Sequence, residues 1–158
     1  MEIAGKVAVI TGAASGIGRA VAAELARRNV RAMAVVDVGE NIETAAAEIN
    51  AHAGRRVAFA YRGDATDEAF RASVFDSISS EFDTVRMCVP AAGITRDDLA
   101  VRIDKMTGKA RIYPVDRFRH VIDVNLVAPV YWALEMIGRI AENRAACGLK
   151  RWDPAEGM

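Results

Sequence analysis

Short apolar runs alternate along the chain with longer segments of helical spacing. The apolar runs cover residues 6–11, 31–37, 56–61 and 84–89, and they are nearly continuous, as in parallel strands covered on both faces. Between them, predicted helices at 17–28 and 42–53 each carry one apolar stripe, formed by Ile17, Val21, Ala22 and Leu25 and by Ile42, Ala45, Ala46 and Ile49. The pattern predicts an α/β fold. Right-handed crossovers predict a doubly wound parallel sheet with strand order 3-2-1-4.

The pattern changes between residues 95 and 115. There, Val101 and Ile103 alternate with polar residues before the turn dipeptide Thr107-Gly108, and Ala110 and Ile112 alternate after it, which predicts a small hairpin. Helical spacing then returns with one long apolar face over residues 118–141, which Pro129 is expected to bend or interrupt. Residues 1–150 are thus predicted to form one domain, and residues 151–158, which have no periodicity, are predicted to be a tail.

Composition and charge favour small-molecule chemistry in the cytoplasm. The chain is 52% hydrophobic and 27% charged, and its 21 basic and 21 acidic residues cancel, so no net field recruits nucleic acid or an anionic membrane. Neither an export signal nor a continuous apolar run of membrane-spanning length is evident. Two widely spaced cysteines and two histidines predict neither a metal site nor a disulfide, and the histidines are assigned no function.

A glycine-rich loop follows the first predicted strand and leads directly into a helix. Its sequence is Thr11-Gly12-Ala13-Ala14-Ser15-Gly16-Ile17-Gly18. Glycines let an anionic ligand approach the backbone closely, and the unsatisfied N–H groups and dipole of a helix N-terminus favour negative charge. Because the loop lies between a strand and an amphipathic helix, it predicts a site for the pyrophosphate of a dinucleotide.

Two acidic residues come at the ends of later strands. Asp37 closes the second strand about twenty residues beyond Gly18, where a carboxylate accepts hydrogen bonds from an adenosine ribose. It would repel the 2′-phosphate of NADP by about 4 kcal/mol at 4 Å and an effective dielectric near 20, so NAD is the expected cofactor. Asp64 ends the third strand and is a candidate for the adenine edge. The alternative for each aspartate is to cap the helix that follows it.

Several of these motifs together resemble the short-chain dehydrogenase/reductase superfamily, whose fold is a Rossmann-type sheet. They are the glycine loop, Asp37, Asp64 followed by Ala65, the segment 92–97 (Ala-Gly-Ile-Thr-Arg-Asp) and Val124-Asn125-Leu126. Residues 94–102 are most similar to 3-oxoacyl-[acyl-carrier-protein] reductases. One departure is Pro90-Ala91, which stands where the family usually has two asparagines.

The resemblance implies roles for individual residues. Pyrophosphate would be held by Gly12, Ser15, Gly16, Ile17 and Gly18, ribose by Asp37, adenine by Asp64 with Ala65, and Gly93 would flank the cofactor. Asn125 would match the catalytic asparagine, whose backbone carbonyl holds a water in a proton relay. Its alternative is a structural asparagine bonding within its own helix. The apolar face over 118–141 would pack against its copy in a partner subunit; the alternative is that it packs in the core of its own subunit.

The remaining catalytic residues implied by the resemblance are not found in the chain. The family uses a serine, a tyrosine and a lysine four residues after the tyrosine, but Tyr61, Tyr113 and Tyr131 are followed at that spacing by Ala65, Arg117 and Glu135. We therefore predict the cofactor-binding part of an NAD(P)-dependent oxidoreductase, with an incomplete sheet, that is inactive alone on a carbonyl or alcohol substrate. The alternative is a non-catalytic module that binds NAD or pairs with a full-length relative.

Overall fold

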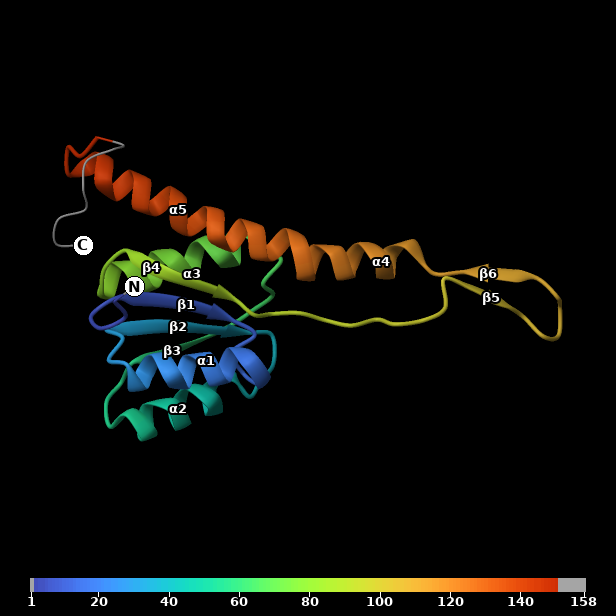
Figure 1. Cartoon of the computed structure of the whole chain (residues 1–158), viewed down its shortest axis with the longest axis horizontal. Coiled ribbons are helices and arrows are strands. Elements are labelled where there is room, and N and C mark those ends of the chain that lie inside the picture. Colours follow the sequence, from blue (N-terminus) through green and yellow to red (C-terminus); the bar gives the residue numbers. More distant parts are fainter. Residues whose placement is uncertain (1, 151–158) are drawn as a thin grey trace.

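A parallel four-stranded sheet forms the centre of the protein in the computed structural model, which describes residues 2–150 (Figure 1). Its strands are β1 (Val7–Thr11), β2 (Ala32–Asp37), β3 (Ala58–Arg62) and β4 (Val85–Pro90), in the order β3-β2-β1-β4. This confirms the predicted α/β class and strand order. The carboxyl ends of the strands therefore meet along one edge, where parallel sheets place their ligands. The predicted tail, residues 151–158, lies outside the described residues.

Helices cover both faces of this sheet. On one face, α1 (Gly16–Arg27) and α2 (Ile42–Ala53) enclose a core with Ile10, Met33 and Val35. On the other face, α3 (Glu68–Glu81) and α5 (Ala128–Ala146) pack over Val9, Val36 and Phe75. The apolar stripe predicted for α1 is wrong at its first residue, Ile17. Ile17 is 78% exposed because it lies in the first turn of α1, beyond the part of the helix that the sheet covers.

The long C-terminal helix is continuous through Pro129. It begins as α4 (Val115–Ile122), passes through a five-residue π-helical segment (Asp123–Val127) and continues as α5. The expected interruption at Pro129 is therefore wrong. Pro129 lies at the start of α5, and the preceding π-turn is closed by a hydrogen bond that the Ala128 N–H donates to the Asp123 carbonyl. Proline lacks an N–H, and a wide turn of this kind lets the helix pass it without a break.

Side chains of α5 anchor this helix to the domain. Trp132 is fully buried, lies 5.7 Å from Phe75 between ring centroids, and donates its indole N–H to the Ala65 carbonyl at 2.8 Å. Arg139 binds Glu135 one turn earlier at 2.9 Å and also reaches Asp76 on α3 at 2.5 Å. One face of the helix is therefore fixed to α3 and to the loop after β3.

By length and composition, the helical run Val115–Ala146 is also long and apolar enough to cross a membrane. Its 32 residues contain an 18-residue window of mean hydropathy 1.3, of which 17% is buried. The run contains no continuous apolar stretch of that length, because polar residues interrupt the helix. Trp132 and the Arg139 ion pairs fix the run to the domain, and the absence of a membrane partner stays a prediction.

A two-stranded antiparallel sheet stands where the hairpin was predicted. It consists of β5 (Val101–Ile103) and β6 (Ala110–Ile112), and Figure 1 shows it projecting from the body beyond α4. Gly108 has a left-handed backbone (φ 67°) in the turn, as a tight hairpin connection requires.

Candidate functional site

The glycine loop after β1 is packed too closely for side chains at two positions. Gly12 has a φ of 67°, and an added Cβ would lie 2.7 Å from the backbone of Ala91 and Ala92 in the loop after β4. At Gly18, an added Cβ would lie 2.3 Å from the carbonyl oxygen of Gly12. These glycines therefore let α1 begin directly against β1 and the loop after β4, which brings the N-terminus of α1 to the carboxyl edge of the sheet.

The first turn of α1 has no side-chain cap. Ser15 occupies the N-cap position with an extended backbone, and its side chain accepts no capping hydrogen bond. The first turn holds no acidic residue either. Uncapped N–H groups and a positive dipole end attract anionic oxygen, so this helix end fits a phosphate group.

Asp37 holds the glycine loop in place. Its Oδ2 accepts a hydrogen bond from the Ala14 N–H at 3.0 Å, and its Oδ1 accepts one from the Gly39 N–H at 2.9 Å. Asp37 does not cap α2, which begins after Asn41. The carboxylate is half-buried beside the loop, and each of its oxygens has lone pairs beyond those used here. It can therefore accept from a sugar hydroxyl.

Asp64 also makes a local turn rather than a helix cap. Its Oδ1 accepts hydrogen bonds from the Thr66 N–H at 2.9 Å and from the Thr66 hydroxyl at 2.8 Å. The cap of α3 is Asp67, whose side chain accepts from the Phe70 N–H. The capping alternative for Asp64 is therefore wrong, and its exposed carboxylate lies at the end of β3 beside Ala65.

One cavity of about 720 Å³ lies along the carboxyl edge of the sheet. All nine residues predicted to contact the cofactor line it, namely Gly12, Ser15, Gly16, Ile17, Gly18, Asp37, Asp64, Ala65 and Gly93. The exposed Ile17 is thus part of the cavity wall. Sequence reasoning missed other lining residues, among them Arg96 and His120, because their approach depends on how the loop after β4 and the α4 helix fold over the edge.

Asn125 lies outside this cavity and ties the loop after β4 to the long helix. Its Oδ1 accepts from the Ile94 N–H at 2.8 Å, and its Nδ2 donates to the Ile94 carbonyl at 2.9 Å. The alternative that Asn125 bonds within its own helix is wrong, because its side chain pairs with backbone 31 residues away. Pro129, four residues later, has no N–H to donate to the Asn125 carbonyl, so this carbonyl lacks its usual helical donor.

Replacing Asn125 with alanine is expected to release the Ile94 backbone. Two hydrogen bonds are lost together, so local stability should fall by about 1–2 kcal/mol. Hydrogen exchange of the Ile94 amide measures this directly and should become faster. Asn143→Ala on α5 is the control, since the Asn143 side chain forms no hydrogen bond within residues 2–150. Unchanged protection of Ile94 in Asn125→Ala would contradict the assignment.

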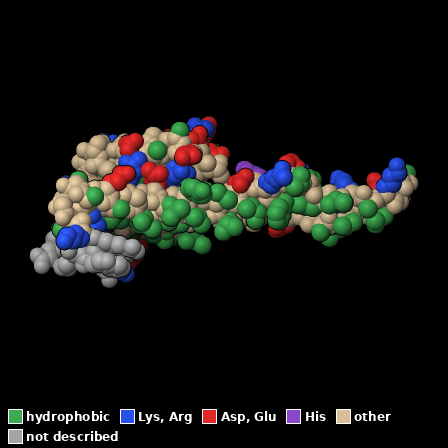
Figure 2. Space-filling model, turned by 90° about the horizontal axis from the view of Figure 1, so that it is seen from above, with side chains coloured by type: hydrophobic (Ala, Val, Ile, Leu, Met, Phe, Trp, Pro, Cys, Tyr) green, Lys and Arg blue, Asp and Glu red, His purple; other side chains and the backbone are tan. Residues whose placement is uncertain are grey.

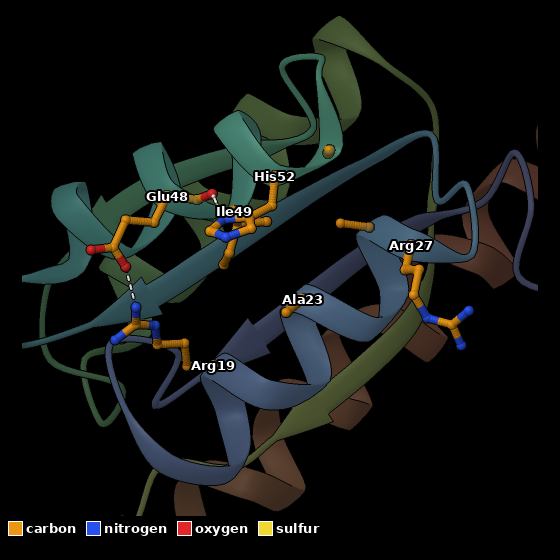
Figure 3. Close-up of a pocket in the computed structure, with 8 residues that line it drawn as sticks. Arg19, Ala23, Arg27, Glu48, Ile49 and His52 are labelled. Carbon is orange, nitrogen blue, oxygen red and sulfur yellow. Dashed lines mark hydrogen bonds and ion pairs between the residues drawn. The ribbon is translucent and has the colours of Figure 1, made fainter.

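A second hollow, of about 350 Å³, lies between α1 and α2 and is separate from the cavity (Figure 3). Ala23 and Ile49 form part of its floor, and the Arg19–Glu48 ion pair crosses one end. The His52 ring nitrogen Nδ1 lies 2.7 Å from the Glu48 carbonyl oxygen within the same helix. None of the residues predicted to form the site lies here.

The fold and the site together define a class, the nucleotide-binding α/β proteins with a glycine loop at the first strand–helix turn. Comparison with known families identifies the family. The model of the short chain dehydrogenase family matches residues 6–146, and the chain belongs to this family. Members of the family use NAD(P).

The relatives include enzymes of different substrates. The chain is 41% identical over 95 residues to D-threitol dehydrogenase of Mycolicibacterium smegmatis. This match covers 58% of this chain and 35% of that protein. It is 37% identical over 103 residues to the 3-oxoacyl-[acyl-carrier-protein] reductase FabG of Escherichia coli, and this match covers 65% of this chain and 40% of that protein. A crystal structure of a short-chain type dehydrogenase/reductase from Mycobacterium marinum superposes with a TM-score of 0.72 at 26% identity. The superposition covers 90% of this chain and 53% of that one. The chain thus spans less than half of the length of these curated relatives.

Proposed function

We propose that this chain binds NAD(H) in the cavity at the carboxyl edge of the sheet and forms the cofactor-binding part of an oxidoreductase. The observation that carries the proposal is the uncapped N-terminus of α1, which opens into a cavity lined by every residue predicted to contact a dinucleotide. A cavity of about 720 Å³ is within the usual range for sites that enclose a cofactor.

Each part of the cavity suits one part of the dinucleotide. Ser15 and the N–H groups of Gly16, Ile17 and Gly18 would hold the pyrophosphate, and Gly12 would let it approach the loop. Asp37 would accept from the adenosine ribose, Asp64 and Ala65 would contact the adenine, and Gly93 would flank the nicotinamide half. When bound, the cofactor supplies or accepts a hydride. The chain's own groups bind and orient it.

A preference for NAD over NADP follows from Asp37. A negative carboxylate, fixed by two backbone N–H groups, would face the 2′-phosphate of NADP at close range. Because the two hydrogen bonds hold the Asp37 carboxylate in place, it cannot turn away from the 2′-phosphate. We therefore expect a higher dissociation constant for NADPH than for NADH.

The complete reaction would interconvert a carbonyl and an alcohol, as the names of the relatives suggest for a sugar alcohol and for a 3-oxoacyl group. Within the 158 residues, no tyrosine is followed four residues later by lysine, so we expect no turnover from this chain alone. The same observation favours the second candidate, a non-catalytic module that binds NAD(H). Asn125 would hold the loop beside the cavity through its two hydrogen bonds with Ile94, and its match to the catalytic asparagine stays a prediction.

Titration with NADH and NADPH tests this function. Nicotinamide fluorescence and thermal shift should show saturable NADH binding, with NADPH at least about tenfold weaker because of Asp37. Reduced nicotinamide mononucleotide, which lacks the adenosine half, is the control ligand and should bind most weakly. Absence of binding by both dinucleotides would overturn the proposal. Binding without turnover is the result that both candidates predict for this chain alone.

A further inference from the structure

A polar pocket lies at the amino edge of the sheet, where the strands begin, at the opposite end from the cofactor cavity. It has a volume of about 390 Å³, and its polar lining consists of Lys6, Arg31, Asp83, Thr84, Arg86 and Asn143. Figure 1 shows α5 running back toward this edge, so the helix contributes Asn143 to the wall. The pocket and the cavity share no lining residue.

Three basic residues stand at the starts of three neighbouring strands. Lys6 and Arg31 come directly before β1 and β2, and the Arg31 N–H donates to the Lys6 carbonyl at 2.8 Å. Arg86 is the second residue of β4, which is the other neighbour of β1. Because the strands are parallel, their starts meet at one edge, and all three residues line the same pocket.

A bulge in β4 sets the position of Arg86. Val85 pairs with Val7, and the next pair joins Met87 to Ala8. Arg86 is therefore an extra residue with no partner in β1. Residues two apart in a regular strand share a face, but Val85 packs under α3 and α5 whereas Met87 packs under α1 and α2. Bulges re-aim side chains, and this one leaves an arginine outside both cores and in the pocket wall.

The three cations have no counterion in the part of the chain that the structure describes. Lys6, Arg31 and Arg86 form neither an ion pair nor a side-chain hydrogen bond there. The acidic residue of the lining, Asp83, accepts a hydrogen bond from the Thr84 N–H at 2.6 Å. The lining therefore has a net charge of +2, in a chain whose net charge is zero. Like charges held together repel one another, and a bound anion relieves this repulsion.

We propose that this pocket binds the phosphate group of a small polar molecule, either inorganic phosphate or a phosphate monoester. A phosphate monoester carries a charge of about −1.5 to −2 at pH 7, which complements the net charge of the lining. The planar guanidinium groups of Arg31 and Arg86 match pairs of phosphate oxygens, and Lys6 adds a point charge. Asn143 and Thr84 add neutral side chains that form hydrogen bonds.

The rest of the lining favours a ligand with a polar body. Val7 is the hydrophobic side chain of the lining and is only 1% exposed, and no aromatic ring is present on which a base could stack. Figure 2 shows exposed hydrophobic side chains gathered along the long helix and the hairpin instead. A volume of about 390 Å³ is near the lower end of the range for small-molecule pockets. We therefore expect a short sugar or polyol body rather than a nucleotide or a lipid.

Phosphate titrations followed by amide NMR test this site on the full chain. Inorganic phosphate and glycerol 3-phosphate are the probes, and the N–H signals of Gly5 and Thr84 in the pocket wall should shift saturably. Tighter binding of glycerol 3-phosphate would identify an ester as the ligand, and tighter binding of phosphate would identify the free anion; both results support the site. Citrate at equal ionic strength is the control anion, and it should bind at least about tenfold more weakly because carboxylates do not reproduce the tetrahedral phosphate.

Single substitutions change the charge of the pocket in both directions. Arg86→Gln should weaken phosphate binding about tenfold, because a charged partner is lost, and Lys6→Gln should do the same if Arg86→Gln does not fold. Asp83→Asn should strengthen binding about threefold, since it removes a negative charge while its amide oxygen still accepts from the Thr84 N–H. Arg117→Gln, on α4 and outside the pocket, makes the same chemical change as Arg86→Gln and should leave phosphate binding unchanged.

The proposal would be overturned by an absence of saturable binding, or by citrate that binds as tightly as phosphate. It would also be overturned by an affinity that is unchanged in both Arg86→Gln and Asp83→Asn, or that falls equally in Arg117→Gln, in variants that remain folded by circular dichroism. Phosphate held at the glycine loop instead would be displaced by NADH and would be insensitive to Arg86→Gln. The substituted residues lie outside the cofactor cavity, so NADH titration of the same variants reports on the proposed function separately.

Discussion

Replacing Gly18 with alanine is expected to abolish NADH binding and to lower the free energy of unfolding by about 3 kcal/mol. The added Cβ would lie 2.3 Å from the Gly12 carbonyl oxygen and 2.7 Å from the carbon of the same carbonyl group. Because both atoms belong to the backbone, no side chain can rotate away, so the glycine loop or the start of α1 must move. Chemical denaturation and NADH titration measure the two effects.

Gly138→Ala is the matched control for Gly18→Ala. Gly138 lies within α5, and no heavy atom lies within 4 Å of the position that its Cβ would take. Alanine in an open helical position should stabilise the chain by about 1 kcal/mol and leave NADH binding unchanged. Wild-type NADH affinity in Gly18→Ala would show that the first turn of α1 is not the pyrophosphate site.

Replacing Asp37 with asparagine is expected to shift the ratio of the NADH and NADPH dissociation constants about ten- to hundredfold toward NADPH. The full repulsion between unit charges at 4 Å is about 4 kcal/mol at an effective dielectric near 20, and screening by salt reduces it. A tenfold to hundredfold change corresponds to about 1.4–2.8 kcal/mol. Parallel titrations at one ionic strength give the ratio.

Asp64→Asn serves as the control for Asp37→Asn, since it makes the same chemical change at the other predicted adenosine contact. Asp64 is expected to lie near the adenine rather than the 2′-position, so its neutralisation should change the affinities for both cofactors alike. An unchanged ratio in Asp37→Asn, or an equal shift in Asp64→Asn, would remove Asp37 as the determinant of cofactor choice.

Periodicity in the sequence was sufficient to predict the sheet and the loop that carries the cavity. The four apolar runs became β1 to β4; the signal is strongest in the central strands β1 and β2, because a strand buried on both faces needs apolar residues at nearly every position. Glycine spacing located the tight turn because Gly12 and Gly18 contact backbone, a requirement that only glycine meets. These signals are local, and they depend on nothing far away in the chain.

Features that depend on distant contacts could not be predicted. Ile17 follows the apolar spacing of α1, but the first turn of the helix extends past the sheet, so the spacing misplaced it in the core. The partner of Asn125 is backbone 31 residues earlier, and Arg96 and His120 reach the cavity through the path of the loop after β4. Nothing in the local sequence around these residues encodes such distances.

The two hydrogen bonds of Asp37 bear on how cofactor choice can change during evolution. The carboxylate that would exclude a phosphorylated ribose also accepts the N–H groups of Ala14 and Gly39, so one side chain serves both ligand discrimination and the shape of the loop. A lineage that exchanges this residue for a neutral or basic one loses at least one acceptor for the backbone N–H groups of Ala14 and Gly39 at the same step. Adaptation to the other dinucleotide must therefore proceed through at least one compensating substitution near residues 14 and 39, and intermediates without it carry a cost in folding.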